Sequence, residues 1–166
     1  MKTKKIKKNR GFVLLFAVML SSIILAIALG VENIALKEIN FGTSARETNN
    51  AFFAADTGAE CALFNDKSNT SVFALDGTGT FPSCLGSQIP FSSPVVTDTS
   101  SATYYFIIPE LGSASISCAN VSVKKEDNLD GTITTTVTSK GYNNGGGQGS
   151  CIPTSNSVER ELQVIY

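Results

Sequence analysis

Four cysteines are the side chains of this sequence that could hold a metal or form covalent bonds: Cys61, Cys84, Cys118 and Cys151. None of them forms a close CxxC pair, and the chain has no histidine. Structural zinc sites combine close pairs of Cys or His on short loops, so this spacing argues against a metal site. An even number of widely spaced cysteines indicates two disulfide bonds in an oxidising compartment, and the sequence alone allows three pairings.

The remaining polar motifs do not predict a catalytic site. Without histidine, a Ser or Cys nucleophile would need a Lys or carboxylate base, and no motif supplies one. Asp127–Gly131 lacks the other ligands of a calcium loop, so we interpret it as an acidic turn between two strands. Gly141–Gly149 lacks the Lys-Ser/Thr of a phosphate loop, and we expect a flexible surface loop there. We predict no enzyme activity, no metal and no cofactor.

The charges are distributed unevenly along the chain. Six of the 13 basic residues lie within the first ten positions, without an acid among them: Lys2, Lys4, Lys5, Lys7, Lys8 and Arg10. The rest of the chain has 7 basic residues against 14 acidic ones. A basic cluster ahead of an apolar run is typical of a membrane-topology signal. Because no basic face remains for the folded part, we predict no specific nucleic-acid partner.

A run of 21 residues without a charge follows, from Gly11 to Val31. As a helix it would be roughly 30 Å long, the thickness of the hydrocarbon core of a bilayer. The preceding cations would keep the N-terminus in the cytoplasm and send Glu32 to the other side. Two other interpretations are open. Ala26-Ile27-Ala28 fits the cleavage site of a secretory signal, and the run could also anchor an unrelated ectodomain.

The junction Arg10-Gly11-Phe12 separates the basic cluster from the apolar run. The sequence K-x-K-K-x-K-K-N-R-G-F-V-L-L resembles the class III leader of type IV pilin-like proteins, which prepilin peptidase cuts on the cytoplasmic side. The resemblance implies a cut between Gly11 and Phe12, an N-methylated Phe12, and an anchor that stays attached. A glycine before the scissile bond lets a protease approach the backbone closely.

Phe16 occupies the fifth place after the implied cut. Most pilins carry a glutamate there, which would neutralise a nearby N-terminal ammonium whose unpaired burial is costly. Minor pilins of the type that this chain resembles, and one tip pseudopilin of type II secretion, also lack it. The resemblance therefore implies a minor or tip-located subunit rather than the main one.

We expect the helix to continue beyond the membrane. No proline occurs before Pro82, and Asn65-Asp66 would end the helix. The apolar residues at helical spacing predict one stripe: Ile34, Ile39, Phe41, Ala45, Phe52, Ala55, Ala59, Ala62 and Leu63. The stretch Ala51–Leu63 is similar to the one that follows the anchor in minor pilins of the PilX kind.

Residues 67–100 are rich in turn residues and predict a long irregular connector. Alternating apolar and β-branched residues then predict four strands, at 103–108, 114–125, 132–139 and 158–166. We expect an antiparallel sheet with one face against the exported helix and the other in water. The ending, residues 139–166, is similar to the last two strands of some small bacterial pilin-like proteins.

The resemblance also bears on the disulfides. Pilins use a disulfide to bound a C-terminal surface region, which favours the pair Cys118 with Cys151. The accompanying pair is Cys61 with Cys84, which would tie the end of the helix to the connector. In the loop-entropy model, each bond would stabilise a small exported domain by roughly 3–4 kcal/mol.

Together these features predict an α+β protein of the pilin-like kind, with a long N-terminal helix packed on a small C-terminal antiparallel sheet. Residues 1–11 would be a cleaved cytoplasmic leader, 12–31 a transmembrane helix, 32–66 its exported continuation and 67–166 a β-rich head. The resemblance implies a single-pass inner-membrane protein with a cytoplasmic N-terminus, which later joins a cell-surface filament.

The implied partners are sister pilin subunits through the N-terminal helix, prepilin peptidase, the inner-membrane assembly machinery, and membrane lipid before assembly. The alternative function is an adhesin-like binding ectodomain that is signal-anchored or secreted. The sequence does not distinguish which machine the subunit would serve: a pilus, a competence apparatus or a type II secretion system.

Overall fold

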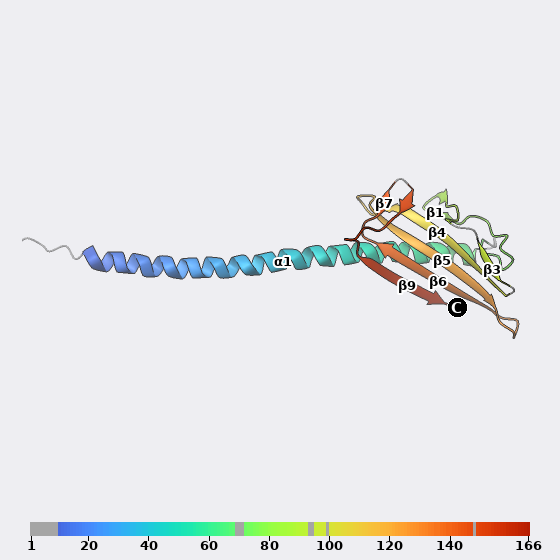
Figure 1. The fold of residues 1–166 in the computed structure, drawn as a ribbon, viewed down its shortest axis with the longest axis horizontal. Coiled ribbons are helices and arrows are strands. Elements are labelled where there is room, and N and C mark those ends of the chain that lie inside the picture. Colours follow the sequence, from blue (N-terminus) through green and yellow to red (C-terminus); the bar gives the residue numbers. More distant parts are fainter. Residues whose placement is uncertain (1–9, 69–71, 93–94, 99, 148) are drawn as a thin grey trace, which may run out of the picture. The chain divides into compact units, whose positions relative to one another are not determined.

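A computed structural model describes residues 10–68, 72–92, 95–98, 100–147 and 149–166. Within them, helix α1 (Arg10–Lys67) precedes all the strands and packs on a C-terminal antiparallel sheet (Figure 1). The predicted α+β class is therefore confirmed. The chain divides into two compact units, Met1–Ser44 and Ala45–Tyr166, and α1 contributes residues to both. We refer to Ala45–Tyr166 as the globular unit.

The globular unit is built around a five-stranded antiparallel sheet of order β3-β4-β5-β6-β9. Its strands are β3 (Val96–Asp98), β4 (Ser101–Leu111), β5 (Ser117–Asp127), β6 (Ile133–Tyr142) and β9 (Glu159–Ile165). Two small ladders accompany it, β1 (Ser83–Cys84) with β2 (Ser87–Gln88), and β7 (Gly146–Gly147) with β8 (Ser150–Cys151). The four predicted strands correspond to β4, β5, β6 and β9. They were predicted from alternating residues, and this alternation is typical of a strand that buries one face.

The connector 67–100 has little regular structure, as predicted: after α1 its described residues form only the short strands β1, β2 and β3. Another prediction about an irregular segment is wrong in part. Gly141 and Tyr142, predicted to begin a surface loop, extend β6 and are buried. The turn predicted at Asp127–Gly131 does join β5 to β6, and Gly131 has a positive φ of 81° there.

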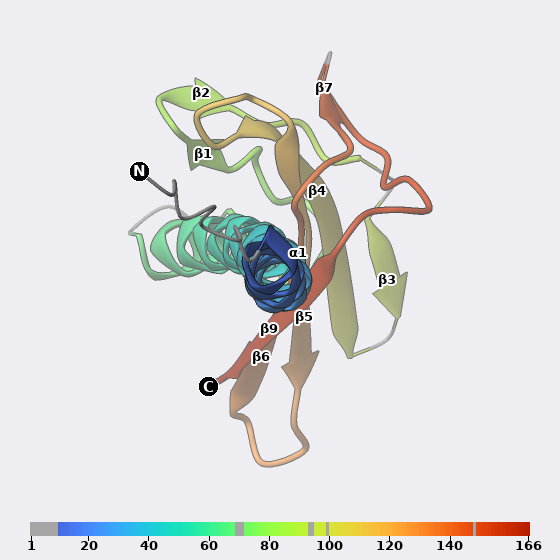
Figure 2. The ribbon, with the colours of Figure 1, turned by 90° about the vertical axis from the view of Figure 1, so that its left-hand side faces the viewer.

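The core lies between α1 and the inner face of the sheet (Figure 2). Tyr104 and Phe106 on β4 lie opposite Val123 and Val121 on β5, and Val137 on β6 lies opposite Val123. All five side chains are buried. Alternate residues of neighbouring strands therefore face the same side of the sheet, which α1 covers with the side chains of residues 45–67.

The predicted helical stripe is only partly right. Ala55, Ala59 and Ala62 are buried, but Phe52 is exposed and the buried positions Ala51 and Ala54 were not predicted. Leu63 is partly buried against the core, whereas the phenylalanines Phe52, Phe53 and Phe64 are exposed and the fully buried apolar positions are alanines. The backbone of the helix approaches the strands so closely that only small side chains fit between them.

Candidate assembly helix and surfaces of the globular unit

The apolar segment, residues 12–31 of α1, has no charged side chain and every one of its residues is exposed. Phe12 is 75% exposed and Ile24 is 65% exposed, although both are large apolar residues. By length and composition, α1 is the one helix among the described residues that could cross a membrane. Such a surface suits a lipid bilayer or the apolar helices of other subunits, since neither leaves apolar side chains in water.

The polar side chains of the apolar segment are bonded to the helix itself. Ser21 Oγ donates to the carbonyl oxygen of Val18 at 2.9 Å, and Ser22 Oγ donates to that of Met19 at 2.8 Å. In hydrocarbon an unpaired hydroxyl would cost several kcal/mol, so internal pairing makes these serines compatible with lipid. The serines therefore do not argue against a membrane location.

The predicted processing site lies at the start of α1. Gly11 belongs to its first turn, and Phe12 and Phe16 are exposed on the helix surface. The predicted leader, residues 1–11, lies outside the described residues except for Arg10 and Gly11. Phe16 offers an aromatic ring at the place where most pilins carry a carboxylate.

The packed segment, residues 45–67 of α1, meets the sheet through two glycines. A Cβ on Gly141 of β6 would come well under 3.0 Å from the backbone of Ala51 and Ala55. A Cβ on Gly58 would come as close to Ser139 Oγ, and within 2.8 Å of a methyl of Val121. These glycines permit the approach of helix and sheet, and sequence patterning missed both because glycine carries no periodic signal.

The C-terminal end of α1 is attached to the sheet by polar contacts. Lys125 Nζ lies 2.6 Å from Asp66 Oδ1, and both side chains are largely buried. The Tyr166 hydroxyl donates to Asp66 Oδ2 at 2.8 Å, and Lys67 Nζ lies 4.4 Å from the centre of the Tyr166 ring. Burial, together with the neighbouring Asp66 carboxylate, raises the pKa of Tyr166 far above its usual value. A charge pair and Tyr166 thus hold this end of the helix.

Asn65 adds a neutral attachment one residue earlier. Its Nδ2 donates to the carbonyl oxygens of Cys61 at 2.8 Å and Ser83 at 3.1 Å, and its Oδ1 accepts from the Ser83 amide at 2.9 Å. Its side chain is buried, so these bonds satisfy polar groups that water does not reach. Asn65 therefore binds the β1 segment to the helix beside Cys84.

The cysteines lie in the two pairs that the resemblance favours. Cys61 and Cys84 are disulfide-bonded with Cα atoms 5.8 Å apart, and Cys118 and Cys151 with Cα atoms 5.6 Å apart. The segment between Cys118 and Cys151 contains most of β5 and all of β6, so that bond encloses the centre of the sheet and not only a surface loop. Tyr142 and Ile107 pack around it on the outer face.

The glycine-rich stretch predicted as a flexible loop is held by hydrogen bonds. The amide of Gly146 donates to the carbonyl oxygen of Ile116 at 2.8 Å, and Ser117 Oγ donates to that of Asn143 at 3.0 Å. Asn143 Oδ1 accepts from the Val158 amide at 2.7 Å. Contacts with residues in and next to β5 and β9 thus hold a stretch that composition alone predicts to be a flexible loop.

The described residues contain no group of three or more His, Cys, Asp or Glu side chains that could hold a metal ion. The features that remain are surfaces for contact: the apolar segment, the packed segment with its exposed aromatic residues, and the outer face of the sheet. A scan against protein-family models, a search of curated proteins and a search of solved structures each found no match for this chain.

Proposed function

We propose that this chain is a minor or tip-located subunit of a type IV pilus-like or pseudopilus filament. The observation that carries the proposal is the division of a single helix into two chemically different parts. The apolar segment exposes large apolar side chains that nothing among the described residues covers. The packed segment is held in the globular unit by small residues, a charge pair and a disulfide. One helix can then insert in a membrane and carry a folded unit.

Assembly would exchange one apolar environment for another. In the membrane the side chains of the apolar segment contact lipid, and in a filament they contact the same segments of sister subunits. Because lipid tails are as apolar as those side chains, the exchange changes the burial of apolar surface little, and inner-membrane assembly machinery could drive it in either direction. The internally bonded Ser21 and Ser22 need no new partner in either place.

Processing by prepilin peptidase would make Phe12 the first residue and leave the helix attached. The new ammonium group would enter an apolar bundle, where an unpaired charge is costly. A carboxylate five residues into the neighbouring helix could neutralise it, but Phe16 cannot. Such a subunit is best placed where it need not supply that charge, at an end of the filament or in small numbers within it.

The mass of the mature protein tests the proposal. The full chain is expressed in bacterial membranes with and without a co-expressed prepilin peptidase, and its intact mass and N-terminal sequence are determined. We expect the peptidase to remove residues 1–11, so that Phe12 comes first, with or without a methyl group. Gly11→Leu should block the cut, whereas the same change at Gly30 should leave it unaffected.

Two outcomes would contradict the proposal. A first residue of Leu29 would identify a secretory signal and an adhesin-like or other secreted protein. Met1 retained in the presence of an active peptidase would identify an ordinary signal anchor. For the place in the filament, deletion of the gene should lower the number of filaments without abolishing them, and complete loss of filaments would indicate the main subunit.

A further inference from the structure

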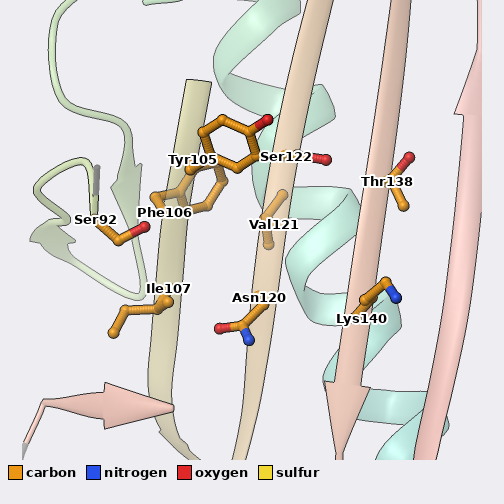
Figure 3. A pocket seen from close by; sticks show the side chains of 9 residues that line it. All are labelled: Ser92, Tyr105, Phe106, Ile107, Asn120, Val121, Ser122, Thr138 and Lys140. Atoms are coloured by element: carbon orange, nitrogen blue, oxygen red, sulfur yellow. The ribbon is translucent and has the colours of Figure 1, made fainter. Parts of the chain in front are cut away.

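Two exposed surfaces of the globular unit differ in how their charges are paired. The outer face of the sheet has a shallow groove of about 350 Å³ across β4, β5 and β6, and its lining includes Tyr105, Ile107 and Asn120 (Figure 3). The cation that lines this groove is Lys140, which lies 3.3 Å from a carboxylate oxygen of Glu159 and is therefore already paired. The charges on the exposed side of α1 are not paired in this way.

A stripe of six side chains runs along α1 on the side away from the buried alanines. Its members are separated alternately by four and three residues: Arg46, Asn50, Phe53, Thr57, Glu60 and Phe64. At 3.6 residues per turn, this spacing keeps all six on one side of the helix. All of them are exposed except Thr57, which is partly buried. We refer to these six residues as the outward stripe.

The two charged members of the outward stripe have no opposite charge within the chain. Neither Arg46 nor Glu60 forms an ion pair with the described residues. No acid stands three or four residues from Arg46, and the residue four before Glu60 is another acid, Asp56. Like charges at this spacing destabilise a helix. An opposite charge from outside the chain would therefore offset a repulsion that the fold leaves in place.

The positions of the charges along α1 are complementary to those of a second α1. Arg46 stands fourteen residues before Glu60 and fourteen residues after Glu32, which is also exposed. Two parallel helices shifted by fourteen residues, or roughly 21 Å, therefore place Arg46 of one copy beside Glu60 of the next. The same shift places Glu32 beside Arg46, and the exposed Ile39 beside Phe53. Both charges then meet an opposite charge, and an apolar pair lies between them.

Other shifts of two parallel copies are less favourable. Without a shift, Arg46 faces Arg46 and Glu60 faces Glu60, and these like charges repel each other. A shift of seven residues places Phe53 of one copy against Glu60 of the next, which takes a carboxylate out of water without giving it a partner. Charge complementarity therefore selects the shift of fourteen residues.

We propose that a second copy of this chain docks on the outward stripe, parallel to the first and shifted by fourteen residues. The proposal rests on the filament function proposed above, because a membrane anchor in each copy makes the two helices parallel. The contact joins residues 32–50 of one copy to residues 46–64 of the next, so a third copy can add in the same way. Phe16 cannot neutralise the N-terminal ammonium of a neighbour, and we therefore expect a short run of copies, as suits the end of a filament.

Photo-crosslinking of the full chain in phosphatidylcholine vesicles tests the shift. The photoreactive amino acid p-benzoylphenylalanine replaces Phe53, and mass spectrometry identifies the residue of the second copy that it joins. We expect crosslinks near Ile39 or near Lys67, which stand fourteen residues to either side of Phe53. The same amino acid in place of Tyr105, which is 38% exposed on the outer face of the sheet, is the matched control and should give no crosslinked pair.

Charge reversal tests the pairing across the contact. Arg46→Glu and Glu60→Arg should each lower the yield of the crosslinked pair about fivefold, since each change brings like charges together. A mixture of the two variants should restore the crosslinked pair, because the two reversed charges then face each other. Glu47→Arg makes the same reversal at an exposed position of α1 outside the outward stripe, and should leave the yield unchanged.

Two results would overturn the proposal: crosslinks that join residue 53 to residue 53 of the second copy or to nothing, and a mixture that crosslinks no better than the single variants. The filament function is tested separately by the cut between Gly11 and Phe12. A cut without the shifted crosslink would refute the docking of a second copy alone. A shifted crosslink without the cut would refute processing by prepilin peptidase alone.

Discussion

The apolar segment and the packed segment belong to one helix and use hydrophobic residues in opposite ways. In the apolar segment, large side chains such as Phe12 and Leu25 are exposed all around the helix. In the packed segment the buried positions are mostly alanines and a glycine, and the large residues Phe53 and Phe64 face outward, 63% and 71% exposed. A large apolar side chain therefore does not identify the face that packs within this chain.

The difference teaches that closeness of approach, and not hydrophobicity alone, decides which face of α1 meets the sheet. Small residues let two backbones come together and gain many weak contacts over the whole length of the interface. Large residues would hold them apart. The large residues stay exposed, where they can contact lipid or another subunit.

The largest effect is expected where the two backbones come closest. Gly141→Ala places a Cβ against the backbone of Ala51 and Ala55, which cannot rotate away as a side chain can. We expect a loss of about 3 kcal/mol or more in the free energy of unfolding. Chemical denaturation of the full chain in detergent, followed by near-ultraviolet circular dichroism, measures it. Gly147→Ala is the control, because nothing lies within 4 Å of its added Cβ. Equal denaturation midpoints for the Gly141→Ala and Gly147→Ala proteins would refute the close approach of helix and sheet.

A second change addresses the apolar segment. Leu20→Arg places a charge in the middle of the uncharged run, and we expect it to raise the free energy of membrane insertion by about 2.5–3.5 kcal/mol. Leu129→Arg makes the same exchange in an exposed turn of the globular unit and should not alter insertion. The fraction of protein that resists carbonate extraction from membranes measures the effect. Unchanged extraction of the Leu20 variant would show that this segment does not lie in lipid.

The same exchange inside the packed segment and just before it sharpens the contrast. Gly58→Ala crowds Ser139 Oγ and Val121, and should destabilise the globular unit by about 1–2 kcal/mol because these side chains can partly move aside. Gly42→Ala meets nothing within 4 Å and should strengthen the helix by up to about 1 kcal/mol. Thermal unfolding of both variants measures the difference. If Gly58→Ala is neutral, the helix and the sheet have room for larger residues.

The smallest effect concerns the end of the packed segment. The pKa of Tyr166 is higher in the folded protein than in the unfolded chain, because the tyrosine is partly buried and donates to Asp66. The contribution of the Tyr166 hydroxyl to stability is therefore fully present below the unfolded pKa of about 10. This contribution is lost as the pH rises above that value. Tyr166→Phe should lower the free energy of unfolding by less than about 1 kcal/mol below pH 10, since the group is partly in water.

Above pH 10 the Tyr166→Phe protein should lose less stability with rising pH than the unmodified protein. Burial also raises the pKa values of Tyr104 and Tyr142, so part of the alkaline loss remains in both. Tyr105→Phe is the control, because Tyr105 is 38% exposed and lies on the outer face of the sheet, away from Asp66. Denaturation curves collected between pH 8 and pH 11 make the comparison; parallel curves for the two proteins would contradict the contact with Asp66.

Local patterns in the sequence were enough to predict the long helix and the four main strands. The uncharged run, the absence of proline before Pro82 and the alternation in residues such as Ile133, Thr135 and Val137 depend only on neighbours in the chain. The disulfide pairs could not be derived in this way. Three pairings were open, and the resemblance to pilins favoured the pairs that the folded chain contains.

The amino-acid sequence by itself determined one helix of membrane-spanning length and a sheet-forming remainder, because charge, hydropathy and periodicity are properties of short stretches. Only the tertiary structure decided that Gly58 and Gly141 must be small, that Asp66 meets Lys125 and Tyr166, and that Tyr105, Ile107 and Asn120 line one groove. Each of these depends on the register between strands or on the distance between a helix and a sheet. Such quantities are fixed when segments far apart in the chain pack together.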